Sequence, residues 1–327
     1  MRFEFFPEEI SEASKRIRAY IRMTPLEYSP HLSSLGSGKV YLKLENFQVT
    51  GSFKIRGAFN KILSLSDEEK EKGVVTASTG NHGVAVAYAL QKLKYKGIIF
   101  LPENASPAKL EDLKFYDVEL RFHGKDCVET ENYARRFASE KGMTYLPPYN
   151  DVKIVAGQGT VGVEIAEQIK NVDSVLVPVG GGGLVSGIAL YLKSINPDIE
   201  IIGCQPLNSP VMYESIKAGK IVEMESKPTL SDGTAGGIEK GAITFEICQK
   251  YVDDFILVTE EEIKNAIRLV VEKHHMIVEG AAALSVASYL KEKERFMGKN
   301  VVLVLSGCRL SSNTLKKIMC GDKNEYI

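Results

Sequence analysis

The sequence predicts an α/β protein with parallel β-sheets, and two observations support this fold class. Short apolar runs alternate with amphipathic stretches of helical length along most of the chain, which is typical of βαβ units. The runs VLVPV and VVLVL are apolar throughout, as expected of strands that are covered on both faces.

The first predicted elements lie between residues 40 and 63. Val40–Leu44 alternates in polarity and indicates a half-buried strand, and apolar residues then recur at helical spacing from Phe53 to Leu63. Further strands are expected at Val74–Ser78, Gly97–Pro102, Val118–His123, Met143–Pro147, Ser174–Val179, Ile199–Gln205 and Asn300–Ser306. Helices are expected between them, in stretches such as NHGVAVAYALQKLKY, ENYARRFASEKG, GTVGVEIAEQIK and TEEEIKNAIRLVVEKHH.

Composition places the chain among ordinary globular proteins. Of 327 residues, 44% are hydrophobic and 25% are charged, which allows one large domain or two smaller ones. The net charge of -1 gives no reason to expect nucleic acid or an acidic membrane surface as a partner. No apolar run approaches the roughly 20 residues of a membrane span. The N-terminus lacks a signal peptide's apolar stretch, and the five scattered cysteines form no CxxC pair, so we expect a cytoplasmic protein.

Lys54 occupies an unusual position for a lysine. It falls in the first turn of a predicted helix, within GSFKIRGAFN, where the positive end of the helix dipole disfavours a cation. An isolated lysine at such a place is usually a solvated surface charge. The alternative is a reactive lysine, and the motifs elsewhere in the chain bear on the choice.

A run of four glycines, Gly180–Gly183, follows the strand expected at Ser174–Val179 and opens a helix. The backbone N–H groups of such a loop can face an anion, which the helix dipole also favours. A dinucleotide fingerprint (GxGxxG) and a Walker motif are both absent, so a single phosphate ester fits better than a pyrophosphate. A flexible turn is the simpler alternative.

A second polar turn, STGNHG at Ser78–Gly83, ends one strand and begins the next helix. Its hydroxyl and N–H groups suit a carboxylate or a second phosphate. The same residues also suit a helix N-cap without any ligand, and the turn by itself leaves both interpretations open.

A reactive lysine, a single-phosphate loop and a second anion site together suggest pyridoxal phosphate. The segments SFKIRGA, STGNHG, PVGGGG and VEGAAALSVA closely resemble the threonine/serine dehydratase and serine racemase family of pyridoxal-phosphate enzymes. The resemblance covers about residues 17–315. It implies two open, twisted, mostly parallel sheets flanked by helices (fold type II), with the cofactor in the cleft between two domains. The small domain would comprise residues 45–148, inserted in a large domain of residues 1–44 and 149–327.

The resemblance also implies roles for individual residues. Lys54 matches the lysine that forms the Schiff base with the cofactor and later removes the substrate's α-proton, and burial would lower its pKa. Ser306 matches the residue that faces the pyridine nitrogen with a neutral hydrogen bond. Further cofactor contacts are expected from Phe53, Asn81, Gly180, Gly181, Gly182, Gly183 and Leu184, with Gly233 and Glu279 lining the cleft. Substrate contacts are expected from Ser78, Thr79, Gly80, Asn81, His82 and Gln158. For Gln158 and its neighbour Gly159, a helix-opening turn is the simpler alternative.

Three features depart from the family pattern. Thr79 stands where the racemases carry a serine, and its methyl group crowds the site, which disfavours racemisation. Gln205 and Val211 stand where carboxylates of the family bind a divalent cation, so no metal is expected. Arg309 lies in SGCR where the family has SGGN. It either recognises a second substrate carboxylate, as in 3-hydroxyaspartate, or turns to a subunit interface or solvent.

The resemblance favours a carbon–oxygen lyase that converts a 3-hydroxy L-amino acid, such as L-threonine or L-serine, to a 2-oxo acid and ammonia. The alternatives are an amino-acid racemase and a cofactor-binding protein without turnover. A nicotinamide-dependent dehydrogenase lacks its fingerprint here. Because the family commonly forms dimers or tetramers, we expect a homo-oligomer. The given sequence stops soon after the family motifs, where biosynthetic threonine dehydratases continue into a regulatory domain, so we expect a catabolic or specialised role.

Overall fold

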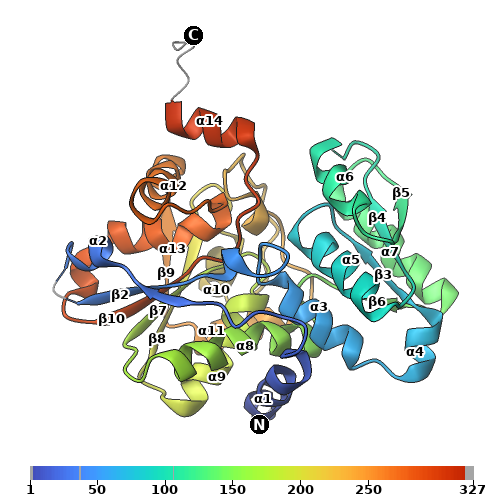
Figure 1. The fold of residues 1–327 in the computed structure, drawn as a ribbon, viewed down its shortest axis with the longest axis horizontal. Helices are drawn as coiled ribbons and strands as arrows, with labels where there is room; N and C mark the ends of the chain where they lie inside the picture. Colours follow the sequence, from blue (N-terminus) through green and yellow to red (C-terminus); the bar gives the residue numbers. More distant parts are fainter. Residues whose placement is uncertain (1–2, 37, 106, 321–327) are drawn as a thin grey trace.

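Two separate sheets form the β-structure of the computed structural model, which describes residues 3–36, 38–105 and 107–320 (Figure 1). The larger sheet has six strands in the order β1-β2-β10-β7-β8-β9. Strands β1 and β2 pair antiparallel, and the other neighbours pair parallel. These strands are β1 (Leu26–Tyr28), β2 (Lys39–Lys43), β7 (Ser174–Pro178), β8 (Glu200–Pro206), β9 (Asp254–Val258) and β10 (Asn300–Val304).

The smaller sheet is parallel and has four strands in the order β5-β4-β3-β6. Its strands are β3 (Val74–Ala77), β4 (Gly97–Leu101), β5 (Glu119–Phe122) and β6 (Thr144–Tyr145). The helices that alternate with them are α4 (Asp67–Lys72), α5 (Asn81–Leu93), α6 (Pro107–Lys114) and α7 (Cys127–Lys141). Figure 1 shows these elements grouped at one side of the molecule, on the right of the view.

Both faces of the larger sheet are covered, as its apolar strands predict. In β10, Val301 and Leu303 belong to the core that includes α12 (Glu260–His274) and α13 (Gly280–Lys291). Val302 and Val304 belong to the core that includes α8 (Val152–Gln168) and α9 (Gly183–Ile195). This alternation is the two-residue period of a strand. Helix α11 (Ile243–Tyr251) covers the sheet together with these four helices.

Helix α3 (Lys54–Leu63) lies between the two groups of elements and packs against both α8 and α5 (Figure 1). Its backbone touches that of α8, because a Cβ atom on Gly157 would lie 2.7 Å from the Arg56 carbonyl oxygen. The remaining elements are the helices α1 (Phe6–Ile17), α2 (Pro30–Ser33), α10 (Val211–Ala218) and α14 (Ser312–Cys320), and the 3-10 helices η1 (Glu45–Phe47), η2 (Asp232–Thr234) and η3 (Lys293–Phe296).

The predicted α/β class with mostly parallel sheets is confirmed, and each expected strand is present within a few residues of its predicted bounds. The edge strands β1 and β9 were not predicted. Strand β1 has three residues, too few to show a period. Strand β9 follows α11 after two residues, neither of them Gly or Pro, so no turn signal marks its start.

The two sheets use different parts of the chain. The smaller sheet uses residues 74–145, and the larger sheet takes strands from both sides of this stretch. The domain boundaries near residues 45 and 148 stay a prediction. Across the described ranges, no helix combines the length and the apolar character that crossing a membrane requires.

Candidate active site

A cavity of about 1030 Å³ lies where strands of both sheets end. Ser78 follows β3, Gly180 follows β7 and Ser306 follows β10, and all three line the cavity. Ligands of open α/β sheets bind outside the carboxyl ends of the strands, so this is the expected place for a site. The predicted site residues that line it are Phe53, Lys54, Ser78, Thr79, Gly80, Asn81, His82, Gly180, Gly181, Gly182, Gly183, Leu184 and Ser306, with Gly233, Glu279 and Arg309.

Lys54 is the first residue of α3, and its side chain lines the cavity. Its Nζ donates a hydrogen bond to the carbonyl oxygen of Pro148 at 2.9 Å and lies 5.2 Å from the centre of the Phe53 ring. Burial lowers the pKa of the Lys54 amine to about 8, although the Glu279 carboxylate opposes this shift. A substantial fraction of the amine is therefore neutral near physiological pH, as a nucleophile or base must be.

The loop Gly180–Gly183 presents backbone to the cavity because its neighbours leave no room for side chains. A Cβ atom on Gly181 would lie 2.4 Å from the Tyr149 ring, and one on Gly180 would lie 2.9 Å from the Cα of Thr234. Gly182 has φ +84°, which favours glycine. Helix α9 begins at Gly183 without a side-chain cap, so the loop and this helix start can offer N–H groups to an anion.

The second predicted anion site lies at the start of α5. Gly83 packs so closely on the strand end that a Cβ atom there would lie 2.1 Å from the Ser78 carbonyl oxygen. The Gly80 N–H donates to the Ser78 hydroxyl at 3.2 Å. His82 is 4% exposed, with its Nε2 3.1 Å from the Leu146 carbonyl oxygen. Burial, aided by Lys54, lowers the pKa of His82 to about 3, so this ring is neutral and adds no positive charge to the site.

Glu279 lies inside the cavity and is 5% exposed. It accepts hydrogen bonds from the side-chain amide of Asn81 and from the backbone N–H of Arg309. Burial raises the pKa of the Glu279 carboxyl to about 7. The Asn81 Oδ1 atom is buried and has no partner among the described residues. The Asn81 amide can therefore still take part in binding a ligand.

The segment after β10 also lines the cavity, next to Glu279. Ser306 is 2% exposed, and its carbonyl oxygen accepts from the Phe53 N–H at 3.2 Å. Arg309 lines the cavity and pairs with the carboxylate of Asp112 on α6. The guanidinium therefore already has a carboxylate partner within the chain, which neither sequence-based alternative for Arg309 anticipated.

Gln158 lies away from the cavity, inside the contact between α3 and α8. It is 1% exposed, and its Oε1 accepts from the Gly57 N–H at 3.2 Å. Neither Gln158 nor Gly159 lines the cavity. The structure places both within α8, past its first turn, so the helix-opening alternative does not describe them either. We therefore leave Gln158 out of the substrate contacts proposed below.

Two groups of cavity residues were not singled out from the sequence. Tyr149 packs on the glycine loop and accepts from the Glu239 N–H through its hydroxyl at 2.8 Å. Thr130 and Glu131 of α7 also line the cavity. The place of Thr130 and Glu131 depends on how α7 packs on strands β3, β4 and β6 of the smaller sheet, and no local motif predicts that packing.

The predicted absence of a metal site stays a prediction. In the described part of the chain, no group of three or more His, Cys, Asp or Glu side chains is arranged to hold a metal ion. The Gln205 side chain is occupied by the backbone, since its Nε2 donates to the Val179 carbonyl at 3.1 Å and its Oε1 accepts from the Tyr213 N–H at 2.8 Å. Val211 is 2% exposed in a hydrophobic core.

The fold and this site define a class: a two-sheet α/β enzyme with a lysine, a glycine loop and a polar helix start around one cavity. The model of the pyridoxal-phosphate dependent enzyme family matches residues 17–307, and the chain belongs to this family. This confirms the predicted family resemblance and the predicted cofactor.

Named relatives agree with this assignment. An L-threonine ammonia-lyase of Thermotoga maritima is 42% identical over 313 residues, which are 95% of this chain and 77% of that protein. A catabolic L-threonine dehydratase of Staphylococcus aureus is 46% identical over 303 residues, 91% of this chain and 87% of that protein. The structure of maize serine racemase matches with a TM-score of 0.90 and 34% identity, covering 96% of each chain.

The residues in the cavity fit pyridoxal phosphate. The backbone of Gly180–Gly183 faces the cavity at a helix start, as a phosphate requires. Lys54 has an amine whose pKa is about 8, which suits attack on an aldehyde. The buried Asn81 amide has an oxygen without a partner among the described residues. These groups therefore match the phosphate and the aldehyde of this cofactor, and the free Asn81 oxygen can accept a hydrogen bond from its phenolic hydroxyl.

Proposed function

We propose that this chain is a pyridoxal-phosphate-dependent carbon–oxygen lyase that converts a 3-hydroxy L-amino acid, L-threonine or L-serine, to a 2-oxo acid and ammonia. The observation that carries the proposal is Lys54, an amine with a pKa of about 8 in the same cavity as the glycine loop. The activities in the names of the two sequence relatives support a lyase. Pyridoxal phosphate, when bound, withdraws electrons from the substrate's α-carbon.

The chain's own residues would bind the cofactor and move the α-proton. The N–H groups of Gly180–Gly183 would hold the phosphate, and the Ser306 hydroxyl would donate to the pyridine nitrogen. The free Asn81 amide oxygen would accept a hydrogen bond from the hydroxyl on the phenolic oxygen. The Phe53 ring would stack on the pyridine. The neutral Lys54 amine would anchor the cofactor and accept the proton from the substrate's α-carbon.

The loop Ser78–His82 would bind the substrate carboxylate. These residues line the cavity, and their hydroxyl groups and the uncapped N–H groups at the start of α5 would donate hydrogen bonds to the carboxylate. Because His82 is neutral, the carboxylate would be held by hydrogen bonds and by the helix dipole, without a cation from this loop. The resulting orientation would bring the α-proton to Lys54.

A racemase is the second candidate, supported by the likeness to maize serine racemase. Racemisation needs a second base on the face of the cofactor opposite the lysine. The residue proposed for that face is Thr79, which lines the cavity. Its β-branched side chain has restricted χ1 and adds a methyl group, so Thr79 is a poor choice for this base.

The deciding experiment measures 2-oxo acid release from L-threonine, L-serine and L-threo-3-hydroxyaspartate, with Lys54→Ala as the control. We expect release from L-threonine or L-serine and none from Lys54→Ala. Inversion of L-serine without 2-oxo acid would favour the racemase. No reaction, despite a cofactor absorbance that changes on adding amino acid, would favour a binding protein without turnover.

A cytoplasmic homo-oligomer is part of the proposal. Large apolar side chains remain on the surface of this single chain, among them Met23, Phe47 and Ile277, which are 53%, 43% and 47% exposed. Covering such side chains is a common result of self-association. Light scattering during size-exclusion chromatography would give the mass; a single 36.1 kDa species would contradict this part.

A further inference from the structure

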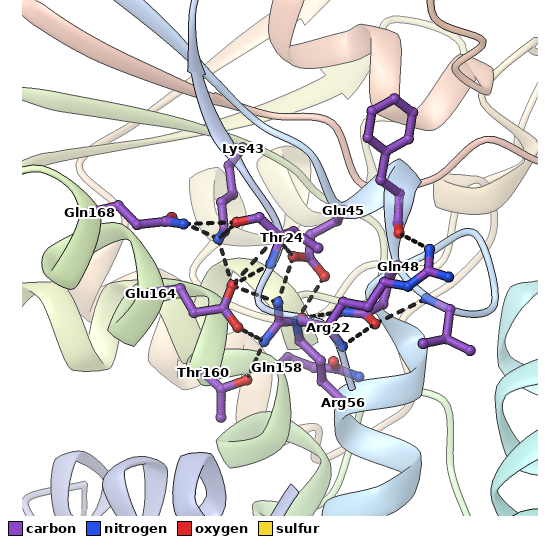
Figure 2. A network of polar contacts seen from close by, with 12 residues as sticks. Arg22, Thr24, Lys43, Glu45, Gln48, Arg56, Gln158, Thr160, Glu164 and Gln168 are labelled. Atoms are coloured by element: carbon purple, nitrogen blue, oxygen red, sulfur yellow. Dashed lines mark hydrogen bonds and ion pairs between the residues drawn. The ribbon is translucent and has the colours of Figure 1, made fainter. Parts of the chain in front are cut away.

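Arg56 lies two residues after Lys54 and is completely buried. Its Nε and Nη2 atoms donate to the two carboxylate oxygens of Glu45 at 2.8 and 2.7 Å. Its Nη1 and Nη2 atoms donate to the two oxygens of Glu164 at 2.7 and 2.9 Å. Figure 2 shows the guanidinium between these two carboxylates. Because two edges of the planar group are engaged, both its position and its orientation are determined.

The surrounding groups complete a buried hydrogen-bond network in which the positive and negative charges balance (Figure 2). Lys43 donates to the Glu164 carboxylate at 2.5 Å and to the Thr24 carbonyl oxygen at 2.8 Å. Two cations, Lys43 and Arg56, thus face two anions. Burial alone would lower the pKa of Arg56, but the Glu45 and Glu164 carboxylates outweigh burial and raise it, so the guanidinium stays charged.

The start of α3 lacks the usual stabilising features of a helix N-terminus. No side-chain hydrogen bond caps the helix, and its first turn has no acidic residue. The cation Lys54 occupies the first position instead. Some other contact must therefore determine where this helix begins and how it is rotated.

Arg56 is in the right place to do so. Two residues along an α-helix correspond to a rotation of about 200°, so Lys54 and Arg56 leave the helix on nearly opposite sides. Lys54 lines the cavity, whereas Arg56 binds η1 through Glu45 and α8 through Glu164. A rotation of α3 that moved Lys54 would break the bidentate contacts of Arg56 with Glu45 and Glu164 on the other side of the helix.

We propose that Arg56 is a positioning residue whose two carboxylate contacts hold the rotation of α3 and thereby direct Lys54 into the cavity. This inference rests on the function proposed for Lys54. Buried ion pairs often contribute little net stability, because desolvation offsets their attraction. Their better-supported use is to select one geometry, which is the use inferred here.

The test compares Arg56→Lys with Lys43→Gln in the full chain. Arg56→Lys keeps the charge but loses the planar group, whereas Lys43→Gln disturbs the same network without removing a contact of Arg56. In cofactor-free protein, competitive acetylation followed by peptide mass spectrometry reports the reactivity of Lys54 relative to the exposed Lys92. The cofactor's visible absorbance then reports its covalent attachment, and thermal unfolding reports stability.

We expect Arg56→Lys to lower the acetylation of Lys54 at pH 8 by about fivefold or more and to slow cofactor attachment by about as much, because a displaced amine regains a higher pKa. Lys43→Gln should lose thermal stability but keep the reactivity of Lys54. Unchanged Lys54 reactivity in Arg56→Lys, or an equal loss in Lys43→Gln, would overturn the inference.

A second variant and the cofactor-free readout keep the test decisive. If Arg56→Lys does not fold, Glu45→Gln takes its place. This variant preserves the shape of one of the two carboxylate partners of Arg56 while removing its charge. Acetylation measures the reactivity of the Lys54 amine and needs neither turnover nor cofactor. An unmodified chain that fails to bind pyridoxal phosphate would therefore contradict the proposed function, while the acetylation pattern would still decide the role of Arg56.

Discussion

The side-chain amide of Asn81 donates to both carboxylate oxygens of Glu279, at 2.9 and 3.0 Å. Asn81 begins α5 beside the smaller sheet, and Glu279 directly precedes α13 beside the larger sheet. This contact therefore joins two walls of the cavity that come from different sheets. It also holds a buried carboxyl group, with a pKa of about 7, next to the proposed cofactor site.

Glu279 makes the stability of the cofactor-free chain depend on pH. Burial raises its pKa from 4.5 to about 7 in the folded state. Its contribution to stability is therefore complete below pH 4.5 and is lost as the pH rises through 7, a change of about 3 kcal/mol. In Glu279→Gln this loss disappears. Urea unfolding would measure the stability of both proteins at about pH 5 and at about pH 8. We expect the stability of Glu279→Gln, relative to that of the unmodified chain, to be higher at pH 8 than at pH 5. A difference that is the same at both pH values would contradict the assignment.

Lys54 makes cofactor attachment depend on pH in the opposite direction. The neutral amine is the reactive form, and its pKa is about 8. The rate of attachment should rise about tenfold per pH unit well below pH 8 and level off above it. Stopped-flow absorbance of the cofactor after mixing would measure this profile. A rate that keeps rising to pH 10 would show an amine with an ordinary pKa.

The glycine loop should not tolerate a methyl group. In Gly181→Ala the new Cβ atom would lie 2.4 Å from the Tyr149 ring, so the loop or the ring must move. Such overpacking costs about 1–3 kcal/mol. We expect a lower thermal midpoint and weaker binding of pyridoxal phosphate in an equilibrium titration.

Gly237→Ala provides the matched control for this prediction. Gly237 also lines the cavity, but a Cβ atom there would meet no atom within 4 Å. Its thermal midpoint should stay close to that of the unmodified chain. An equal loss of stability in both variants would mean that the contact with Tyr149 is not the cause.

Arg309 should have little influence on which substrate is chosen. Its guanidinium pairs with Asp112, and both side chains remain partly exposed, so the pair is worth about 0–1 kcal/mol. We expect Arg309→Ala to change kcat/KM by similar factors for L-threonine and L-threo-3-hydroxyaspartate. A selective loss with the dicarboxylate would instead show that Arg309 leaves Asp112 to bind substrate. Asp112→Asn is the control that frees the guanidinium without removing it.

Divalent cations should not affect this chain. Gln205 and Val211 provide no anionic oxygen where the family pattern has carboxylates, and the Gln205 amide is already bonded to the backbone. We predict the same thermal midpoint and the same turnover in EDTA and in excess Mg²⁺ or Ca²⁺. A rise of several degrees with either ion would reveal a binding site elsewhere.

Local chemistry explains why so much of the site could be predicted from the sequence. Glycines at the junction of a strand and a helix indicate an anion site whatever the rest of the fold, because backbone N–H groups do the binding. The alternation of apolar strands with amphipathic helices likewise predicts parallel sheets. Lys54 stood out because a cation at a helix start is locally unfavourable.

Longer-range relationships could not be predicted in the same way. Glu164 is 108 positions from Arg56, and Glu279 is 198 positions from Asn81. A single sequence contains no signal that pairs such residues. The same limit led to the expectation of a substrate contact for Gln158, which the packing of α3 on α8 buries away from the cavity.

The sequence by itself determined the fold class, the family and the cofactor-binding motifs, since each depends on residues close together in the chain. Only the tertiary structure decided which charges are buried, which of them are paired and where Lys54 points. Those properties arise when α3 is enclosed between α8 and α5. There burial lowers the pKa of Lys54, and the carboxylates of Glu45 and Glu164 hold Arg56 behind it.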